Sequence, residues 1–438
     1  MKPVRVGLLG LGTVGGGTVN VLGRNGEEIA RRAGRQISIT RAAVRSLDAP
    51  RICDTSGMDV TTDTRSVALD PDVDVIVELM GGTELARELV LEAVRAGKHV
   101  VTANKALIAL HGNEIFAAAQ ANAVTVAFES AVAGGIPIIK AIREGLAGNR
   151  IEWLAGIING TANFILTEMR EKGRAFDDVL ADAQALGYAE ADPTFDIEGI
   201  DAAHKLAILG SIAFGIPLDF DSLYIEGITG ITPLDVQFAE ELGYRIKHLG
   251  IARRSQAGIE LRVHPTLVPE RRLIANVNGV MNAVLVKGDA VGPTLYYGAG
   301  AGAEATASAV IADLVDVVRA LTTDPGNRVP HLAFQADQVT AVPIAPIEDV
   351  VSAHYLRMRA QDRPGVLAEV ANFLAGQGIS IEAVVQKEPA PGEESVHLIM
   401  LTQAVKEGAL NAAIAQIEAS EHITGAVTKL RLEPLVGD

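Results

Sequence analysis

The sequence predicts an α/β fold in three parts: a doubly wound parallel sheet, an α+β domain, and a small ferredoxin-like domain at the C-terminal end. Three observations predict it. Short apolar runs alternate with helical stretches as far as residue 133, helices precede several strand-like runs between 134 and 320, and residues 351–438 follow the order β-α-β-β-α-β. The chain has 438 residues, which is enough for about three domains.

The first part, residues 1–133, alternates strands with helices such as the one expected over 84–97. This alternation is typical of a parallel sheet that helices cover on both faces. Ligands of such sheets bind at the carboxyl ends of the strands. The strands are expected at 3–9, 37–45, 73–80, 99–103 and 124–128.

The second part, residues 134–320, is expected to be an α+β domain with a mostly antiparallel sheet. Its last helix, over 303–320, has the length and apolar pattern to pack back on the first part. Residues 321–350 contain four prolines and few apolar runs, which predicts a linker. Residues 351–438 then form the third part.

The composition excludes several classes of protein. A net charge of −16 argues against nucleic-acid binding, which needs a basic surface. The single cysteine, Cys53, allows no disulfide framework within one chain and predicts a reducing, cytoplasmic setting. No stretch of about 20 apolar residues occurs, so we expect no membrane span. We interpret the apolar N-terminal run as a strand rather than a signal peptide, because its glycine spacing explains it better.

Gly10-Leu-Gly12-Thr-Val-Gly15 follows the first strand and opens a helix. In that setting the first glycine permits a tight turn, the second lets the backbone approach a pyrophosphate, and the third allows the helix to pack closely on the strand. The helix start, with Thr13 and Val14, offers N–H groups to phosphates. The pattern favours a dinucleotide site of the Rossmann type. The alternative is a glycine-rich turn without a ligand.

The end of the second expected strand favours NADP(H) over NAD(H). NAD sites usually carry Asp or Glu there, whereas this strand ends Ala43-Val44-Arg45-Ser46. Arg45 is suited to meet a 2′-phosphate, although it lies later than the usual spacing. The alternative is a solvated arginine at a strand end.

Five segments together resemble homoserine dehydrogenase, and a sixth resembles the ACT domain, a small ligand-binding regulatory module. The five are GLLGLGTVGGG, VTANKALIA, GGIPIIKAIREGL, GIINGTANFILTEM and GYAEADPTFDIEGIDAAHKLAIL, and the sixth is AQDRPGVLAEVANFLAGQGISI. The resemblance covers nearly the whole chain. It implies the reversible interconversion of L-aspartate 4-semialdehyde and L-homoserine with a nicotinamide cofactor, on the route to threonine, methionine and isoleucine.

Lys205 lies on a helix, 200–214, that is apolar on all sides after its first turn. This pattern predicts a buried helix rather than an exposed Asp201–Lys205 ion pair. A desolvated lysine can donate a proton to an alkoxide and take it back in the reverse reaction. The resemblance implies that Lys205 is this acid and base, and that Asp201 orients it or holds the substrate.

The resemblance also implies how the amino-acid substrate is held. Glu190 and Asp201 match the homoserine-binding carboxylates of the family, and Asp196 is a third candidate. Asp192 precedes a proline and Glu198 precedes a glycine, so we interpret both as turn residues.

Lys105 follows the strand expected at 99–103, at the edge where doubly wound sheets bind their ligands. The resemblance implies that it contacts the cofactor and the substrate, and we expect it to polarise the carbonyl oxygen. The alternative is a phosphate-side or solvated lysine. Asn104 is suited to cap the following helix. The resemblance also places Gly187 and Gly302 at the cofactor, although Gly187 alone would be interpreted as the end of a helix.

The segment from residue 129 to 136 is a loop rich in glycine and alanine. Carbonyl oxygens in such a loop, together with one carboxylate, suit a hard cation. The resemblance implies a monovalent cation, with sodium as the first candidate, held by Glu129, Val132, Gly134 and Ile136. The alternative is a plain crossing between domains.

The loop Asp362-Arg-Pro-Gly365 precedes the first helix of the third part. In ACT domains this loop helps to bind an amino acid between paired domains, and L-threonine is the first candidate as effector. The alternative is a passive dimerisation module. We expect a homodimer or a homotetramer.

Two other functions compete with this interpretation. Aspartate-semialdehyde dehydrogenase needs a nucleophilic cysteine, and Cys53 lies in a variable region of the first part that does not suit this role. A non-catalytic amino-acid sensor built on dinucleotide and ACT domains would have no use for Lys105 and Lys205.

Overall fold

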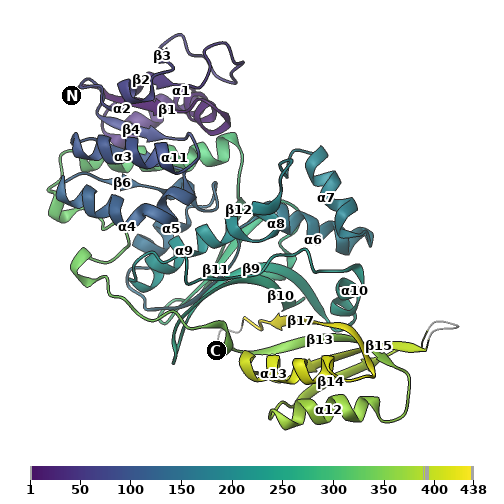
Figure 1. Cartoon of the computed structure of the whole chain (residues 1–438). Coiled ribbons are helices and arrows are strands. Elements are labelled where there is room, and N and C mark those ends of the chain that lie inside the picture. Colours follow the sequence, from purple (N-terminus) through teal and green to yellow (C-terminus); the bar gives the residue numbers. More distant parts are fainter. Residues whose placement is uncertain (1, 388, 390–393, 436–438) are drawn as a thin grey trace. The chain divides into compact units, whose positions relative to one another are not determined.

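The computed structural model describes residues 2–387, 389 and 394–435 (Figure 1). They fall into two compact units, each drawn from separate stretches of the chain. The first unit is drawn from residues 1–160, 201–221 and 280–342, and the second from 161–200, 222–279 and 343–438. The segment 134–320, which we expected as one domain, is therefore divided between the two units.

A six-stranded parallel sheet forms the centre of the first unit, in the order β3-β2-β1-β4-β5-β6. This confirms the predicted doubly wound sheet. This strand order is that of dinucleotide-binding folds. Successive strands are added to one side of β1 as far as β3 and then to the other side from β4, and ligands of such folds bind at this switch between β1 and β4. The short strand β3 was not expected, because its residues form no apolar run. The strands are β1 (Val4–Leu9), β2 (Ile37–Ala43), β3 (Asp59–Thr61), β4 (Val75–Glu78), β5 (His99–Thr102) and β6 (Val126–Ala127).

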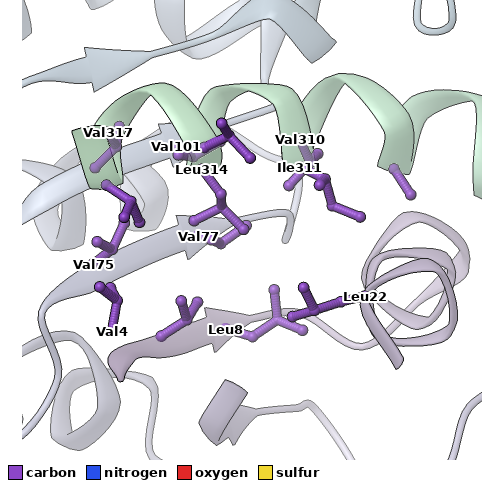
Figure 2. Packing of buried hydrophobic residues seen from close by; sticks show 14 of the residues in the cluster. Val4, Leu8, Leu22, Val75, Val77, Val101, Val310, Ile311, Leu314 and Val317 are labelled. Atoms are coloured by element: carbon purple, nitrogen blue, oxygen red, sulfur yellow. The ribbon is translucent and has the colours of Figure 1, made fainter. Parts of the chain in front are cut away.

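Helices pack on this sheet, and one of them comes from much later in the chain. Figure 2 shows that Val310, Leu314 and Val317 of α11 share one core with Val75 and Val77 of β4. The apolar stripe of α11 thus completes the hydrophobic core around the parallel sheet. Within the described ranges, no helix is both long and apolar enough to cross a membrane. The helices are α1 (Thr13–Ala33), α2 (Thr64–Ala68), α3 (Glu84–Arg95), α4 (Lys105–Ala121) and α11 (Ala303–Ala320).

Helices α1 and α11 run parallel and side by side. At one end, a Cβ placed on Gly17 would lie 2.4 Å from the carbonyl oxygen of Ala303, so the two backbones touch. At the other end, the guanidinium of Arg319 donates to the carbonyl oxygen of Arg32 at 2.8 and 3.1 Å. Both helix N-termini therefore lie at the same end of the pair.

An antiparallel sheet and a buried helix complete the first unit. Strand β11 pairs with β7 on one side and with β12 on the other. The elements are β7 (Ile151–Ile157), β11 (Met281–Gly288), β12 (Gly292–Ala299), α9 (Ile200–Phe214), and α5 (Ile138–Lys140), which continues as a π-helical turn (Ala141–Gly145).

The second unit ends in a ferredoxin-like domain whose antiparallel sheet has the order β17-β13-β15-β14. This confirms the β-α-β-β-α-β order predicted for the C-terminal part. Its elements are β13 (Val351–Gln361), α12 (Val366–Gly376), β14 (Ile381–Gln386), β15 (Ser395–Thr402), β16 (Val405–Lys406), α13 (Glu407–Glu418) and β17 (Ile423–Leu432).

Strand pairing joins this domain to the middle of the chain. Strand β17 pairs with β10 in parallel, with Thr266 opposite Arg431. The fully buried guanidinium of Arg431 contacts Glu407 of the same domain and reaches Glu226, just after β8, at 2.7 Å. These contacts explain why segments 161–200 and 222–279 cluster with the C-terminal domain. They contain α6 (Gly160–Lys172), α7 (Phe176–Ala185), α8 (Thr194–Ile197), β8 (Tyr224–Ile225), α10 (Pro233–Glu241), β9 (Tyr244–Ser255) and β10 (Gly258–Pro269).

The contact between α1 and α11 predicts opposite effects for the same substitution at two glycines of α1. Gly17→Ala should lower the melting temperature by several degrees, because the added methyl meets the Ala303 carbonyl, which is rigid backbone. Gly23→Ala meets no atom within 4 Å and should be neutral or stabilising by up to about 1 kcal/mol, since alanine favours a helix. Thermal unfolding of both variants checks this. Equal melting temperatures for the two would contradict the contact.

Candidate active site

The turn after β1 uses each of its three glycines in a different way. Gly10 has a φ of +104°, and a Cβ there would lie 2.7 Å from the carbonyl oxygen of Leu79. A Cβ on Gly15 would lie 2.1 Å from the carbonyl oxygen of Gly10. A Cβ on Gly12 would meet nothing within 4 Å, so this glycine keeps an open face clear. That open face is the place where a pyrophosphate approaches in dinucleotide sites.

Two helices begin near the glycine turn. Helix α1 begins at Thr13 and Val14 with no acidic residue in its first turn, so its N–H groups are not offset by a carboxylate. Helix α11 begins beside it, after Gly302, whose φ of +124° is a conformation that glycine adopts readily. The start of α1 therefore suits the phosphates of a dinucleotide, whereas α11 carries Glu304 in its first turn, where the carboxylate pairs with Arg24.

Arg45 lies at the carboxyl edge of the parallel sheet. It follows β2 directly, its side chain is exposed, and the preceding residue, Val44, is tied to the neighbouring segment by a hydrogen bond to Thr61. An exposed arginine at this edge can pair with a phosphate at the ribose end of a dinucleotide.

A buried network fixes the start of α4, where Lys105 lies. Glu78, at the end of β4, accepts hydrogen bonds from the Thr102 hydroxyl at 2.7 Å and from the Met80 amide at 2.8 Å. Thr102 in turn accepts from the Asn104 amide, and the Asn104 side chain caps α4. Burial raises the pKa of Glu78, while these hydrogen bonds oppose the rise. The ends of β4 and β5 are thus tied together beneath Lys105.

A carboxylate held between two lysines forms the centre of the site. The Asp201 carboxylate lies 2.7 Å from Nζ of Lys205 and 3.0 Å from Nζ of Lys105. The side-chain amide of Asn159 donates to Asp201 at 2.8 Å, and Nζ of Lys205 also donates to the carbonyl oxygen of Ile158 at 2.7 Å. Three segments, the start of α4, the end of β7 and the first turn of α9, therefore meet at one carboxylate.

The cluster is buried, so its charges interact strongly and shift the pKa of Asp201. Asp201 is only 4% exposed, and the side chain of Lys205 is 12% exposed. Burial alone would raise the pKa of Asp201, but Lys205 and Lys105 overcome this and hold the pKa well below its usual range. Asp201 is therefore ionised. The pair is an internal one, as the apolar pattern of α9 predicts, because every residue from 206 to 214 is buried.

Asn159 was not singled out from the sequence. It lies between β7 and α6, and it precedes Gly160, where a Cβ would lie 2.8 Å from the carbonyl oxygen of Val280. An Asn-Gly pair directly after a buried strand is a turn signal, and the only hint in the sequence was this position at a strand end.

The loop 129–136 is held in place largely by the Glu129 side chain. Its carboxylate accepts hydrogen bonds from the amides of Ile139 and Lys140 at 2.9 and 2.8 Å, so it caps the helix that follows. Burial and Asp313 raise its pKa to about 7. Among the described residues, no hydrogen bond reaches the carbonyl oxygens of Val132 and Gly134. Carbonyl oxygens without donors fit a hard cation, and the carboxylate contributes structure instead.

The remaining expected residues lie in the second unit. Gly187 adopts a φ of +75° and ends α7, since its amide and that of Tyr188 donate back to the last turn. Glu190 is exposed, and Asp196 is half-buried in α8. Asp192 accepts from the amide of Thr194 and forms a turn, as its position before proline predicts.

Comparisons with known proteins agree over the whole chain. A family model for homoserine dehydrogenase matches residues 137–315, one for the homoserine dehydrogenase NAD binding domain matches 10–129, and one for the ACT domain matches 354–421. A homoserine dehydrogenase from Pseudomonas aeruginosa is 66% identical over 435 residues, which are 99% of this chain and 100% of that protein. The chain belongs to the homoserine dehydrogenase family.

Solved structures of homoserine dehydrogenases share the fold. The enzyme from Thiobacillus denitrificans is 66% identical and has a TM-score of 0.96, and the match covers 100% of this chain and 99% of that one. A hyperthermophilic archaeal homoserine dehydrogenase, solved in complex with NADPH, is 25% identical with a TM-score of 0.61 over 72% of this chain and 97% of that one. The chain is thus an oxidoreductase with a nucleotide-binding domain and an ACT domain, which confirms the resemblance.

Removal of the Asp201 charge should destabilise the protein. Asp201→Asn leaves two ammonium groups beside an uncharged amide, and loss of one partner of a buried ion pair typically costs about 3–5 kcal/mol. Because the pKa of Asp201 is lowered, this stabilisation is complete above the unfolded value of about 4 and is lost only as the pH falls through the folded value.

Melting temperatures at pH 5 and pH 8 check this prediction. Asp201→Asn should melt several degrees below the wild type, by the same margin at both values. The control is Asp63→Asn, the same chemical change at an exposed helix cap where asparagine serves equally well. A margin for Asp201→Asn no larger than that of the control would show that the cluster is not a buried charge network.

Proposed function

We propose that the chain interconverts L-aspartate 4-semialdehyde and L-homoserine with NADP(H), on the route to threonine, methionine and isoleucine. The observation that supports this best is the buried Asp201 carboxylate between Lys205 and Lys105. A bound nicotinamide cofactor supplies or accepts the hydride. The protein must then manage one proton and the two charged groups of the amino-acid substrate.

Lys205 is the proposed acid and base. When a hydride adds to the aldehyde carbon, the carbonyl oxygen gains a negative charge and takes a proton from Nζ of Lys205. In the reverse direction the neutral amine removes the hydroxyl proton of homoserine. The hydrogen bonds from Nζ to Asp201 and to the Ile158 carbonyl hold it in one orientation, so the proton is delivered along a fixed line.

Lys105 is proposed to polarise the carbonyl oxygen and to contact the cofactor. It is the first residue of α4, at the carboxyl edge of the sheet, and its ammonium is tied to the opposite oxygen of Asp201 from Lys205. Asp201 therefore orients both lysines. Glu190 is proposed to take the substrate ammonium, with Asp201 and Asp196 as further carboxylate contacts.

The cofactor is proposed to be NADP(H) in preference to NAD(H). Arg45 supports this, since it is an exposed cation at the end of β2 where NAD-specific sites carry an acid. A relative solved with NADPH supports it as well. The glycine turn, Thr13, Val14, Gly187 and Gly302 are proposed to complete the cofactor site.

A monovalent cation, with sodium as first candidate, is proposed at the loop 129–136. Its ligands would be carbonyl oxygens of Glu129, Val132, Gly134 and Ile136. The ACT domain is proposed to regulate the reaction, with L-threonine as candidate effector, and the protein is proposed to act as a homodimer or homotetramer. These proposals rest on the family, and for the cation also on the open carbonyls of Val132 and Gly134, since those of Glu129 and Ile136 accept backbone hydrogen bonds.

Turnover should depend on Lys205. With L-aspartate 4-semialdehyde, the wild type should consume NADPH, followed by absorbance, whereas Lys205→Met should lose at least about 100-fold in kcat, the range of general acid–base catalysis. NADPH binding by the variant should stay within about threefold, since Lys205 lies outside the glycine turn. Lys172→Met, the same change at an exposed helical position, should leave kcat unchanged.

Two results would overturn the proposal. If the wild type consumed neither NADPH nor NADH with this substrate, the proposed reaction would be wrong. If Lys205→Met turned over at a near-normal rate, Lys205 would not be the proton donor.

The role of Arg45 predicts a selective effect on one cofactor. Arg45→Ala should raise the KM for NADPH by about tenfold or more, because a hydrogen bond between charged groups contributes about 1.5–3 kcal/mol. The KM for NADH should stay nearly constant, since NADH has no 2′-phosphate. Arg31→Ala removes an exposed arginine from the last turn of α1 and serves as control. An equal rise of both KM values in Arg45→Ala would refute phosphate recognition by this residue.

A further inference from the structure

A cavity of about 750 Å³ lies in the first unit, away from the glycine turn and the lysine cluster. One wall is the C-terminal half of α4, with Asn113, Phe116 and Ala117. The other wall is the segment 325–339, whose prolines predict a linker. A volume of several hundred Å³ is typical of sites that bind small molecules.

Hydrogen bonds and packing contacts hold the walls of this cavity in place. Asn113 joins α4 to the segment after α9 through two hydrogen bonds with Leu218, at 2.8 and 3.1 Å. The ring of Phe334 lies directly on Gly215, where a Cβ would approach it to 2.9 Å. The amide of Thr340 then donates to the carbonyl oxygen of Gly215. The segment 325–339 is thus attached to the ends of α4 and α9.

Three rings contribute to the apolar wall of the cavity. The imidazole of His331 stacks on Phe116 with ring centres 4.9 Å apart. Its Nε2 accepts a hydrogen bond from the amide of Val126 at 3.1 Å, and burial lowers the pKa of His331 to about 4. The ring is therefore neutral and carries its proton on Nδ1, which makes Nδ1 a hydrogen-bond donor. Phe334 and Val329 extend the apolar surface.

Arg328 is the single charged side chain among the described residues that line the cavity. Its guanidinium donates to the carbonyl oxygens of Ala123, at 2.6 Å, and Thr323, at 3.4 Å. Its Nε is buried without a hydrogen-bond partner, and the two bonds above end on backbone carbonyls rather than on a carboxylate. A half-buried cation that is bonded only to carbonyl oxygens favours the arrival of an anion.

We propose that this cavity binds a small organic monocarboxylate with an apolar body. The carboxylate would pair with Arg328, and the body would lie along Phe116, His331 and Phe334. No described acidic residue lines the cavity, so the ammonium of an amino acid would find no anion there. The site is distinct from the cofactor turn and does not depend on the proposed reaction. It lies at the far ends of the two helices that carry Lys105 and Lys205.

Calorimetric titration of the full-length protein tests this site with 3-phenylpropanoate as the probe. The acid should bind with one site per chain, and saturating NADPH should not displace it. The matched amine, 3-phenylpropan-1-amine, and L-phenylalanine should bind at least tenfold more weakly, because the cavity offers a cation and no anion.

Three variants locate the binding. Arg328→Gln should weaken binding at least tenfold, and Ala117→Phe should abolish it by filling the cavity from the exposed face of α4. Arg95→Gln, which removes an exposed arginine from α3, should bind as the wild type does. Circular dichroism of each variant establishes that it is folded.

Four results would overturn the proposal. They are no binding of the acid at millimolar concentration, equal binding of the amine, displacement by NADPH, or undiminished binding by folded Arg328→Gln and Ala117→Phe. Since none of these measurements uses the dehydrogenase reaction, failure here leaves the proposed function untouched. Equally, failure of the proposed reaction leaves this site untouched.

Discussion

The pairing of the buried Asp201 carboxylate with Lys205 and Lys105 is the interaction on which the rest of the first unit depends. An ionised group that is 4% exposed is stable only when its oxygens are satisfied. Here Lys205 and Asn159 donate hydrogen bonds to it, and Lys105 forms a second ion pair. Each partner comes from a different element. The fold must therefore bring the start of α4, the turn after β7 and the first turn of α9 to one point, and small displacements of any of them would leave a buried charge unpaired.

The parallel sheet supplies the rigidity that this arrangement needs. Glu78 and Thr102 tie the ends of β4 and β5 together, so Lys105 begins α4 at a fixed position. Helix α11, although it follows the antiparallel strands in the chain, packs on β4 and sets its N-terminus beside that of α1. The glycine turn and the lysine cluster thus belong to one unit, whereas the proposed site residues Glu190, Asp196 and Gly187 belong to the other.

Much of this could be predicted from the sequence, because periodic patterns and glycine spacings report on local structure. The glycine turn, the strands of the parallel sheet and the burial of α9 follow from such patterns. The sequence does not predict the contacts of Asn159, of the Ile158 carbonyl or of the Glu129 cap. Contacts between distant residues and bonds to backbone carbonyls produce no repeating pattern in the sequence. The division of 134–320 between two units depends on the pairing of β10 with β17, and the cavity beside Arg328 lies in a segment whose prolines indicate only a linker.

Asp201 is proposed to act on the chemistry by orienting Lys205. A double-mutant cycle of kcat at saturating L-aspartate 4-semialdehyde and NADPH, with Asp201→Asn, Lys205→Met and the double variant, tests it most directly. The double variant should lose much less than the product of the two single losses, because with Lys205 absent the carboxylate can orient only Lys105. Losses that multiply in the double variant would contradict it and would show that Asp201 acts independently of Lys205.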